Sequence, residues 1–306
     1  MGSKPLDVVI AGVNKAGTTS LYVSLATHPS VTPSAVKETR FFLPARYGEP
    51  VGPVAEYARY FEADPDPVVR LEATPSYFYG GAAVARAIDD ALPGARIVVV
   101  LREPAARAIS FFQYQKTRLR LAPDLPIEEY LAHADSLTDL DFLDPENECY
   151  FAVRGGSYAD FLPDWLEVFG PDRLRILTFE ELTAEPVRVF AETLIWLGLD
   201  PVQLPNDALA AENRTMGFKS RRLQRVALGA NDRFERLLRK HPKMKRRLRR
   251  LYLRLNGQPA GSHISRDVRR ELTERFREPN ARLAEQLAAA GMPQPAWLEP
   301  APIGIP

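Results

Sequence analysis

Short, mainly apolar runs recur along the chain and predict buried strands of a parallel sheet. They cover residues 8–10, 68–72, 97–101 and 174–177. Segments with apolar residues at helical spacing lie between these runs, such as residues 82–91 and the segment that begins at Pro104. Strands that alternate with helices in this way predict an α/β fold, in which a parallel sheet carries helices on both faces.

The C-terminal part has a different pattern. Residues 223–255 keep apolar positions at helical spacing, and a last amphipathic helix is predicted over residues 265–290 with a break near Pro279. The polar, glycine-broken residues 213–221 predict a loop before this helical part. Residues 219–254 contain 15 Lys and Arg and only 2 Asp and Glu, although the whole chain has a net charge of +1.

This basic segment has several interpretations. The simplest is a solvated helix face. Attraction of an anionic substrate, or contact with an anionic membrane surface through residues 219–254, are functional alternatives. Nucleic-acid binding is disfavoured, because no recognised module and no interleaved aromatic residues accompany the charge.

Composition limits the class of protein further. The 306 residues predict one domain spanning 1–306, without an apolar run of the roughly 20 residues that cross a bilayer. The single cysteine, Cys149, excludes an internal disulfide, and the four histidines have no metal-ligand spacing. The first residues, Met-Gly-Ser-Lys-Pro, lack the features of a signal peptide, so a cytoplasmic location is expected.

The first predicted strand leads into a glycine-bracketed loop. Gly12 and Gly17 flank it, and the next three residues, Thr18, Thr19 and Ser20, open a helix. Free backbone N–H groups and the helix dipole make such a junction an anion site. Its spacing resembles the phosphate loop of nucleotide-hydrolysing enzymes, but the lysine lies inside the loop, at Lys15, instead of following Gly17.

A second strand–helix junction follows the strand at residues 97–101. Arg102 ends the strand, Pro104 begins a helix, and Arg107 and Ser110 follow at a spacing that places them on one helix face. If the strands are parallel, this junction lies at the same sheet edge as the first loop. Arginines and a hydroxyl there predict a second site for a phosphate dianion.

These residues carry a resemblance to a known family. Lys15-Ala-Gly-Thr-Thr-Ser-Leu resembles the 5′-phosphosulfate loop of sulfotransferases that use 3′-phosphoadenosine 5′-phosphosulfate, and Arg102-x-Pro-x-x-Arg-x-x-Ser110 is similar to their 3′-phosphate motif. The resemblance covers nearly the whole chain and is to bacterial members and the heparan-sulfate-type branch. It implies a parallel sheet like that of P-loop NTPases, flanked by helices on both faces, with a helical, basic C-terminal part.

The resemblance also implies which residues bind the donor. Those near its 5′ end are Lys15, Ala16, Gly17, Thr18, Thr19 and Ser20. By the same resemblance, Arg102 and Ser110 bind the 3′-phosphate, and a basic loop with Lys219 and Arg221 closes over the donor.

The resemblance assigns two catalytic residues. Glu38, in Lys37-Glu-Thr-Arg-Phe-Phe42, takes the general-base role, and Lys15 neutralises charge on the leaving group. No metal is implied, and the product is 3′-phosphoadenosine 5′-phosphate. The resemblance further implies an acceptor hydroxyl, ahead of an amine, on a glycan, a glycolipid or a small natural product. Ala73 and Tyr114 stand where some members have a lysine and a histidine, respectively.

Two other functions remain open on the sequence. A kinase or nucleotide hydrolase on the same sheet would need a strand-end carboxylate for magnesium, a part that only Glu72 offers among the strand ends considered. A non-catalytic polyanion-binding protein would use the basic segment and would be indifferent to Glu38. The two junctions in this order favour the sulfotransferase.

Overall fold

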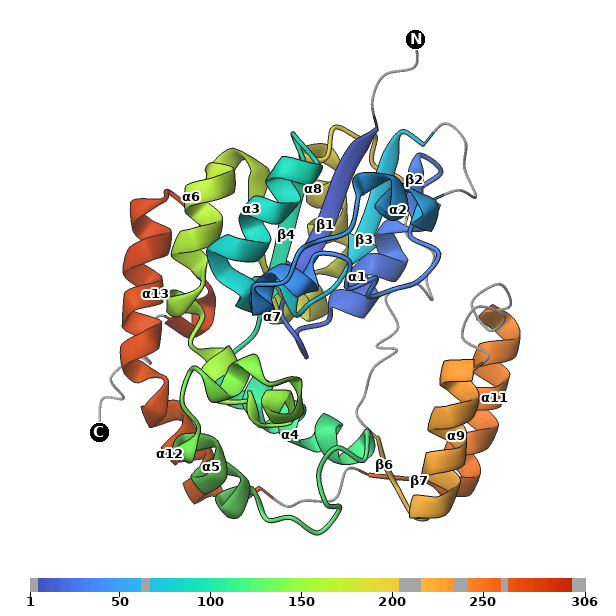
Figure 1. Ribbon diagram of the computed structural model, residues 1–306, viewed down its shortest axis with the longest axis vertical. Helices are drawn as coiled ribbons and strands as arrows, with labels where there is room; N and C mark the ends of the chain where they lie inside the picture. Colours follow the sequence, from blue (N-terminus) through green and yellow to red (C-terminus); the bar gives the residue numbers. More distant parts are fainter. Residues whose placement is uncertain (1–4, 62–66, 204–215, 234–241, 260–263, 299–306) are drawn as a thin grey trace. The chain divides into compact units, whose positions relative to one another are not determined.

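A computed structural model describes residues 5–61, 67–203, 216–233, 242–259 and 264–298 (Figure 1). The chain divides into two compact units. Unit 1 comes from residues 1–107, 155–213 and 273–306, and unit 2 from residues 108–154 and 214–272. The prediction of one domain spanning residues 1–306 stays a prediction.

Unit 1 is built on a five-stranded parallel sheet. The strand order is β2-β3-β1-β4-β5. The strands are β1 (Leu6–Gly12), β2 (Val31–Pro33), β3 (Val69–Ala73), β4 (Arg96–Leu101) and β5 (Leu174–Thr178). The predicted α/β class and the four predicted strands are confirmed. The fifth strand, β2, is a short edge strand beside β3.

The central strands are apolar because both of their faces are covered. Val8, Val9 and Ile10 of β1 are fully buried, and Val9 pairs with Ile97 of β4 on one side and Glu72 of β3 on the other. Since all the strands run in the same direction, their carboxyl ends meet at one edge. The loops that follow β1, β3, β4 and β5 therefore leave the sheet together.

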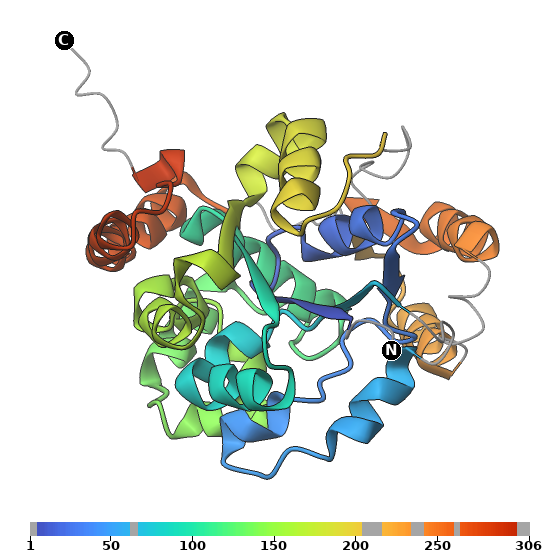
Figure 2. The same ribbon diagram turned by 90° about the horizontal axis from the view of Figure 1, so that it is seen from above.

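Helices cover both faces of the sheet, as Figure 2 shows. One face carries α1 (Thr18–Leu25) and α8 (Pro186–Trp196), and the other carries α3 (Gly81–Ala91) and α6 (Leu162–Arg173). Trp165 of α6 is fully buried and donates a hydrogen bond of 3.0 Å from its indole nitrogen to the carbonyl oxygen of Phe78. This bond satisfies the polar atom of the largest side chain in the core.

Further helices complete unit 1. They are the short α2 (Val54–Ala58), α7 (Phe179–Ala184) and α13 (Arg277–Ala289). The predicted break in the last helix is confirmed, but it lies at Phe276, which separates α13 from α12 (Arg266–Arg275), rather than at Pro279. A proline in the first turn of a helix does not interrupt its hydrogen bonds, which explains why Pro279 is tolerated.

Unit 2 is mainly helical. Helix α4 (Pro104–Thr117) begins in unit 1 and continues into unit 2, which also contains α5 (Ile127–Ser136), α9 (Arg221–Arg233) and α11 (Pro242–Asn256). Residues 213–215 of the predicted loop at 213–221 lie outside the described residues. For the rest the prediction is wrong in part, because β6 (Met216–Phe218) pairs in antiparallel fashion with β7 (Gly257–Pro259). Lone three-residue strands give no alternating pattern in the sequence. No helix among the described residues has both the length and the apolar character of a membrane span.

Candidate active site

The loop between β1 and α1 has the geometry of an anion cradle. Gly17 precedes the first residue of α1 and has a φ of 84°, a left-handed conformation that suits glycine. The first backbone N–H groups of an α-helix, here those of Thr18 and Thr19, have no acceptor within the helix. They lie at the positive end of the helix dipole, which favours a bound anion.

An aromatic ring lies beneath this cradle. A Cβ atom added at Gly17 would lie 3.0 Å from Cδ2 of Phe179, the first residue of α7. The guanidinium carbon of Arg102 lies 4.4 Å from the centre of the same ring. Phe179 therefore supports both the glycine turn and the arginine, a role that the sequence reasoning missed. Its place directly after β5, at the edge where the other loops gather, was the available signal.

The two junctions predicted from the sequence meet through Arg102. Its Nη1 donates a hydrogen bond of 3.0 Å to the carbonyl oxygen of Lys15. The hydroxyl of Tyr158 donates to the carbonyl oxygen of Arg102 at 2.8 Å, which fixes the strand end from which the arginine extends. Burial lowers the pKa of Arg102, with Glu180 as the leading opposing charge.

Lys15 is the central cation of the loop. Burial, followed by repulsion from Arg102, lowers its pKa from 10.5 to about 8, while the carboxylate of Glu38 acts in the opposite direction. The φ of Lys15 is 72°, which is uncommon outside glycine. A lysine whose pKa is lowered by burial and a neighbouring cation, and that is held in a strained turn, is typical of a functional position.

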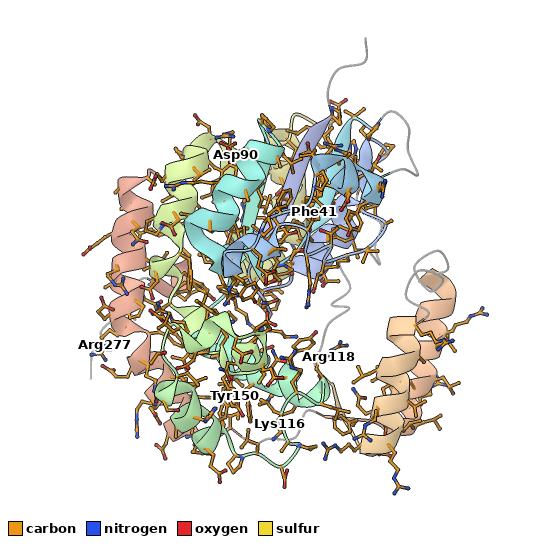
Figure 3. The ribbon with its side chains drawn as sticks, in the orientation of Figure 1. Phe41, Asp90, Lys116, Arg118, Tyr150 and Arg277 are labelled. Carbon is orange, nitrogen blue, oxygen red and sulfur yellow. The ribbon has the colours of Figure 1, made fainter. Side chains whose placement is uncertain are left out.

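Glu38 lies on the loop that follows β2. Its side chain is 42% exposed and its Oε1 forms an ion pair of 2.9 Å with Nζ of Lys37. Its backbone N–H donates to the carbonyl oxygen of Ala73 at 2.9 Å, so the loop runs beside the end of β3. Phe41, labelled in Figure 3, anchors the same loop by packing against Tyr57 of α2, with the ring centres 5.3 Å apart.

The start of α4 is held by carboxylates. Glu103 accepts hydrogen bonds from the backbone N–H groups of Ala105 and Ala106, at 2.9 and 2.6 Å, and Pro104 occupies the first position of the helix. Arg107 is fully buried and its Nη1 lies 3.4 Å from the hydroxyl of Tyr79. The second arginine of the predicted phosphate motif therefore lies in the core of unit 1.

The remaining predicted donor residues belong to unit 2. Ser110 lies on α4 and is half-buried, and Lys219 and Arg221 are exposed at the start of α9. The backbone there is well held, because Asn256 accepts from Lys219 N at 2.8 Å and from Ser220 N at 2.7 Å. Unit 1 by itself brings together Lys15, Glu38 and Arg102.

Glu72, the strand-end carboxylate considered as a magnesium ligand, lies in the protein interior. Glu72 is fully buried, and its Oε1 accepts hydrogen bonds from three hydroxyl groups. In the part of the chain that the structure describes, no three His, Cys, Asp or Glu side chains are grouped so that they could bind a metal ion.

The chain is similar to proteins of known family. Residues 84–240 match the family model described as "Sulfotransferase domain". Over 212 residues the chain is 32% identical to mouse heparan sulfate glucosamine 3-O-sulfotransferase 6, covering 69% of this chain and 57% of the relative. Over 301 residues it is 26% identical to human bifunctional heparan sulfate N-deacetylase/N-sulfotransferase 3, covering 95% of this chain and 31% of the relative.

A solved structure shows the same fold. The crystal structure of a sulfotransferase from Alicyclobacillus acidocaldarius matches with a TM-score of 0.67 and 22% identity, over 96% of this chain and 99% of that chain. The chain spans less than two thirds of the length of both mammalian relatives named above.

Proposed function

The chain belongs to the sulfotransferase domain family, and from this premise we propose that it transfers a sulfuryl group from 3′-phosphoadenosine 5′-phosphosulfate to an acceptor hydroxyl, or to an amine. The observation that carries the proposal is the hydrogen bond between Arg102 and the carbonyl oxygen of Lys15. It joins two cationic strand–helix junctions at one sheet edge, as a nucleotide with a phosphate at each end requires.

The residues assigned to the donor fall into two groups. The 5′-phosphosulfate would be held by the backbone and side chains of Lys15, Ala16, Gly17, Thr18, Thr19 and Ser20. The 3′-phosphate would be held by Arg102 and Ser110, with Lys219 and Arg221 adding positive charge. The close approach of Phe179 to Gly17 supports the first group, because a side chain at position 17 would collide with the ring and distort the loop.

The proposed transfer needs one base and one cation. The acceptor oxygen forms a bond to sulfur as the bond between sulfur and the bridging oxygen of the 5′-phosphate breaks. Glu38 takes the acceptor's proton, and the ammonium group of Lys15 offsets the negative charge that develops on the leaving phosphate. The electrostatic influence of Glu38 on Lys15 supports this pairing, since both groups must flank the transferred sulfur.

For the acceptor we propose a glycan. The mammalian relatives named above are heparan sulfate-modifying enzymes by name, which supports a glycan ahead of a glycolipid or a small natural product. Ala73, which is fully buried at the end of β3, stands where some glycan-modifying members carry a lysine, so this chain lacks that side chain. Competition among the three acceptor classes for labelled sulfuryl transfer tests this choice.

A magnesium-dependent nucleotide hydrolase is the alternative that the structure favours less. Its metal would need a carboxylate that reaches the bound phosphates, but Glu72 is enclosed and already hydrogen-bonded by three hydroxyl groups. A non-catalytic polyanion-binding protein would bind anions but transfer no sulfuryl group. A turnover assay therefore distinguishes it from the enzyme.

For the basic segment we propose contact with an anionic membrane surface. Arg221, Arg222 and Arg225 of α9 are exposed, and so are the apolar side chains of Leu223 and Val226 on the same helix. Cationic and exposed apolar groups on one helix suit an anionic lipid surface. Sedimentation with vesicles containing phosphatidylserine, compared with phosphatidylcholine alone, tests the contact, and equal sedimentation with both would contradict it.

The central test is calorimetry with the product 3′-phosphoadenosine 5′-phosphate, followed by transfer of labelled sulfuryl groups to glycan acceptors without added metal. We expect binding that is much tighter than that of AMP, which lacks the 3′-phosphate. Tighter binding of ATP, or turnover that needs magnesium, would support the hydrolase instead.

A further inference from the structure

The loop that carries Glu38 is held by an ordered set of hydrogen bonds centred on Glu72. Three successive backbone N–H groups, those of residues 40, 41 and 42, each donate to a different hydroxyl oxygen. Arg40 N donates to Thr74 Oγ1 at 3.2 Å, Phe41 N to Thr39 Oγ1 at 3.3 Å, and Phe42 N to the Tyr77 hydroxyl at 3.1 Å.

All three hydroxyl groups then donate to a single oxygen atom. Glu72 Oε1 accepts from Thr39 Oγ1 at 2.6 Å, from Thr74 Oγ1 at 2.6 Å and from the Tyr77 hydroxyl at 3.0 Å. A hydroxyl has one proton, so each group that donates to Glu72 can receive the backbone N–H only through its lone pairs. The carboxylate thus sets the direction of all three proton positions and makes each hydroxyl an acceptor for the loop.

The location of Glu72 makes this arrangement firm. Glu72, Thr74 and Tyr77 are each fully buried, at 0% exposure. Oε2 of Glu72 has no hydrogen-bond partner among the described residues, so the whole accepting role falls on Oε1. Burial raises the pKa of the Glu72 carboxyl, and the hydrogen bonds from the three hydroxyl groups oppose that rise. A low dielectric strengthens hydrogen bonds within such a buried network.

The loop needs such support because its backbone is strained. Glu38 has a φ of 64° and Arg40 a φ of 57°, both in the left-handed region that disfavours residues with a Cβ atom. Strained residues of this kind persist only where the surroundings over-determine them. The hydrogen bonds from the backbone N–H groups of residues 40–42 hold this strained backbone in place. The hydrogen bond from Glu38 N to the carbonyl oxygen of Ala73 does the same at Glu38 itself.

From this geometry we infer that Glu72 is a positioning residue for sulfuryl transfer, which acts through three hydroxyl groups to hold the Glu38 loop in its productive conformation. The inference rests on the proposed role of Glu38 as general base. Glu72 itself touches neither donor nor acceptor. Its partners Thr74 and Tyr77 serve as the acceptors through which it acts on the loop.

The first test removes one acceptor without removing volume. Thr74→Val should raise the hydrogen-exchange rate of the backbone at residues 37–43 about tenfold, the equivalent of one lost hydrogen bond. Turnover should fall by about ten- to 10²-fold, the scale of a misplaced catalytic group. The affinity for 3′-phosphoadenosine 5′-phosphate should stay within about twofold, because the donor loop after β1 is untouched.

The matched control is Thr193→Val. Thr193 is also fully buried in unit 1, but its Oγ1 donates to the carbonyl oxygen of Val189 within α8. This variant should lose a similar amount of thermal stability and leave the exchange of residues 37–43 and the turnover as in the parent protein. A loss of turnover in both variants would make the effect of Thr74→Val one of general stability and would overturn the inference.

Substitution of Glu72 itself gives the graded test. Glu72→Gln retains an oxygen acceptor for the hydroxyl groups, whereas Glu72→Leu removes it. The loop should therefore exchange fastest in Glu72→Leu, and Glu72→Gln should restore much of the turnover lost by leucine. Equal turnover and equal loop exchange in the two variants would contradict the inference. Should the leucine variant not fold, the Thr74→Val comparison stands without it.

A double substitution separates positioning from structure. In a Glu38→Gln background, Thr74→Val should lower the residual turnover no further, because its effect passes through Glu38. An additive loss would overturn the inference. Failure of the proposed function itself would look different, since the parent protein would then transfer no sulfuryl group, while faster loop exchange in Thr74→Val would still support the hydroxyl arrangement.

Discussion

Arg102 Nη1 and the carbonyl oxygen of Lys15 lie 3.0 Å apart and form a hydrogen bond between residues that are 87 positions apart in the sequence. The bond ties the end of β4 to the turn that follows β1. The arginine rests on the ring of Phe179 while it does so. A planar guanidinium group is needed for both contacts, which gives the first prediction.

Arg102→Lys keeps the positive charge but loses the stacked, hydrogen-bonding plane. We expect about 10- to 10²-fold weaker binding of 3′-phosphoadenosine 5′-phosphate, since hydrogen bonds to charged groups contribute about 1.5–3 kcal/mol. Calorimetry measures the change. Arg86→Lys is the control, because Arg86 forms only an exposed ion pair with Glu167. If Arg102→Lys and the parent protein bound 3′-phosphoadenosine 5′-phosphate with equal affinity, Arg102 would not be part of the donor site.

Gly17→Ala tests the contact between the cradle and Phe179. Gly94 is the matched control, because its φ of 86° is close to the 84° of Gly17 but no atom lies within 4 Å of an added Cβ. Both substitutions should cost about 1–2 kcal/mol for the left-handed backbone. Only Gly17→Ala should also weaken donor binding, as calorimetry would show. Weakened binding in both variants would indicate that stability, and not the cradle, is responsible.

The lowered pKa of Lys15 predicts how donor binding depends on pH. The ammonium form predominates below pH 8 and is lost as the pH rises through about 8, so affinity for the anionic donor should fall above that pH. Binding near pH 8 should take up protons, because an anion stabilises the ammonium form. Calorimetry in buffers with different ionisation enthalpies measures this uptake.

Lys15→Arg is the matching variant, because an arginine stays protonated over this range. It should bind the product with an affinity that no longer falls above pH 8. A decline that persists unchanged in Lys15→Arg would assign the titration to another group.

Glu38→Gln should lower turnover by about 10²–10⁴-fold, the contribution typical of a general base. Affinity for 3′-phosphoadenosine 5′-phosphate should hold, because the base faces the acceptor. Glu49→Gln, at another exposed carboxylate after the same loop, is the control and should keep full turnover. Loss of donor affinity in Glu38→Gln would make Glu38 part of the donor site rather than the base.

The sequence by itself determined four of the five strands, their parallel arrangement and the two junctions. Buried parallel strands leave continuous apolar runs, as at Val8–Ile10 and Ile97–Leu101. The glycine of a left-handed turn is recognisable from its position between such a run and a helix, as at Gly17. The parallel pairing of β1 and β4 then placed Lys15 and Arg102 at one edge, as the hydrogen bond between them shows.

Only the tertiary structure decided which side chains support these junctions. Phe179 reaches Gly17 and Arg102 across two strand ends, and Glu72 gathers hydroxyl groups from Thr39, Thr74 and Tyr77. No repeating pattern in the sequence signals either set of contacts. Each set depends on which loops leave the same sheet edge and on how far each side chain reaches. The same physical reason explains why the motif gives no sign that Arg107 is buried beside Tyr79.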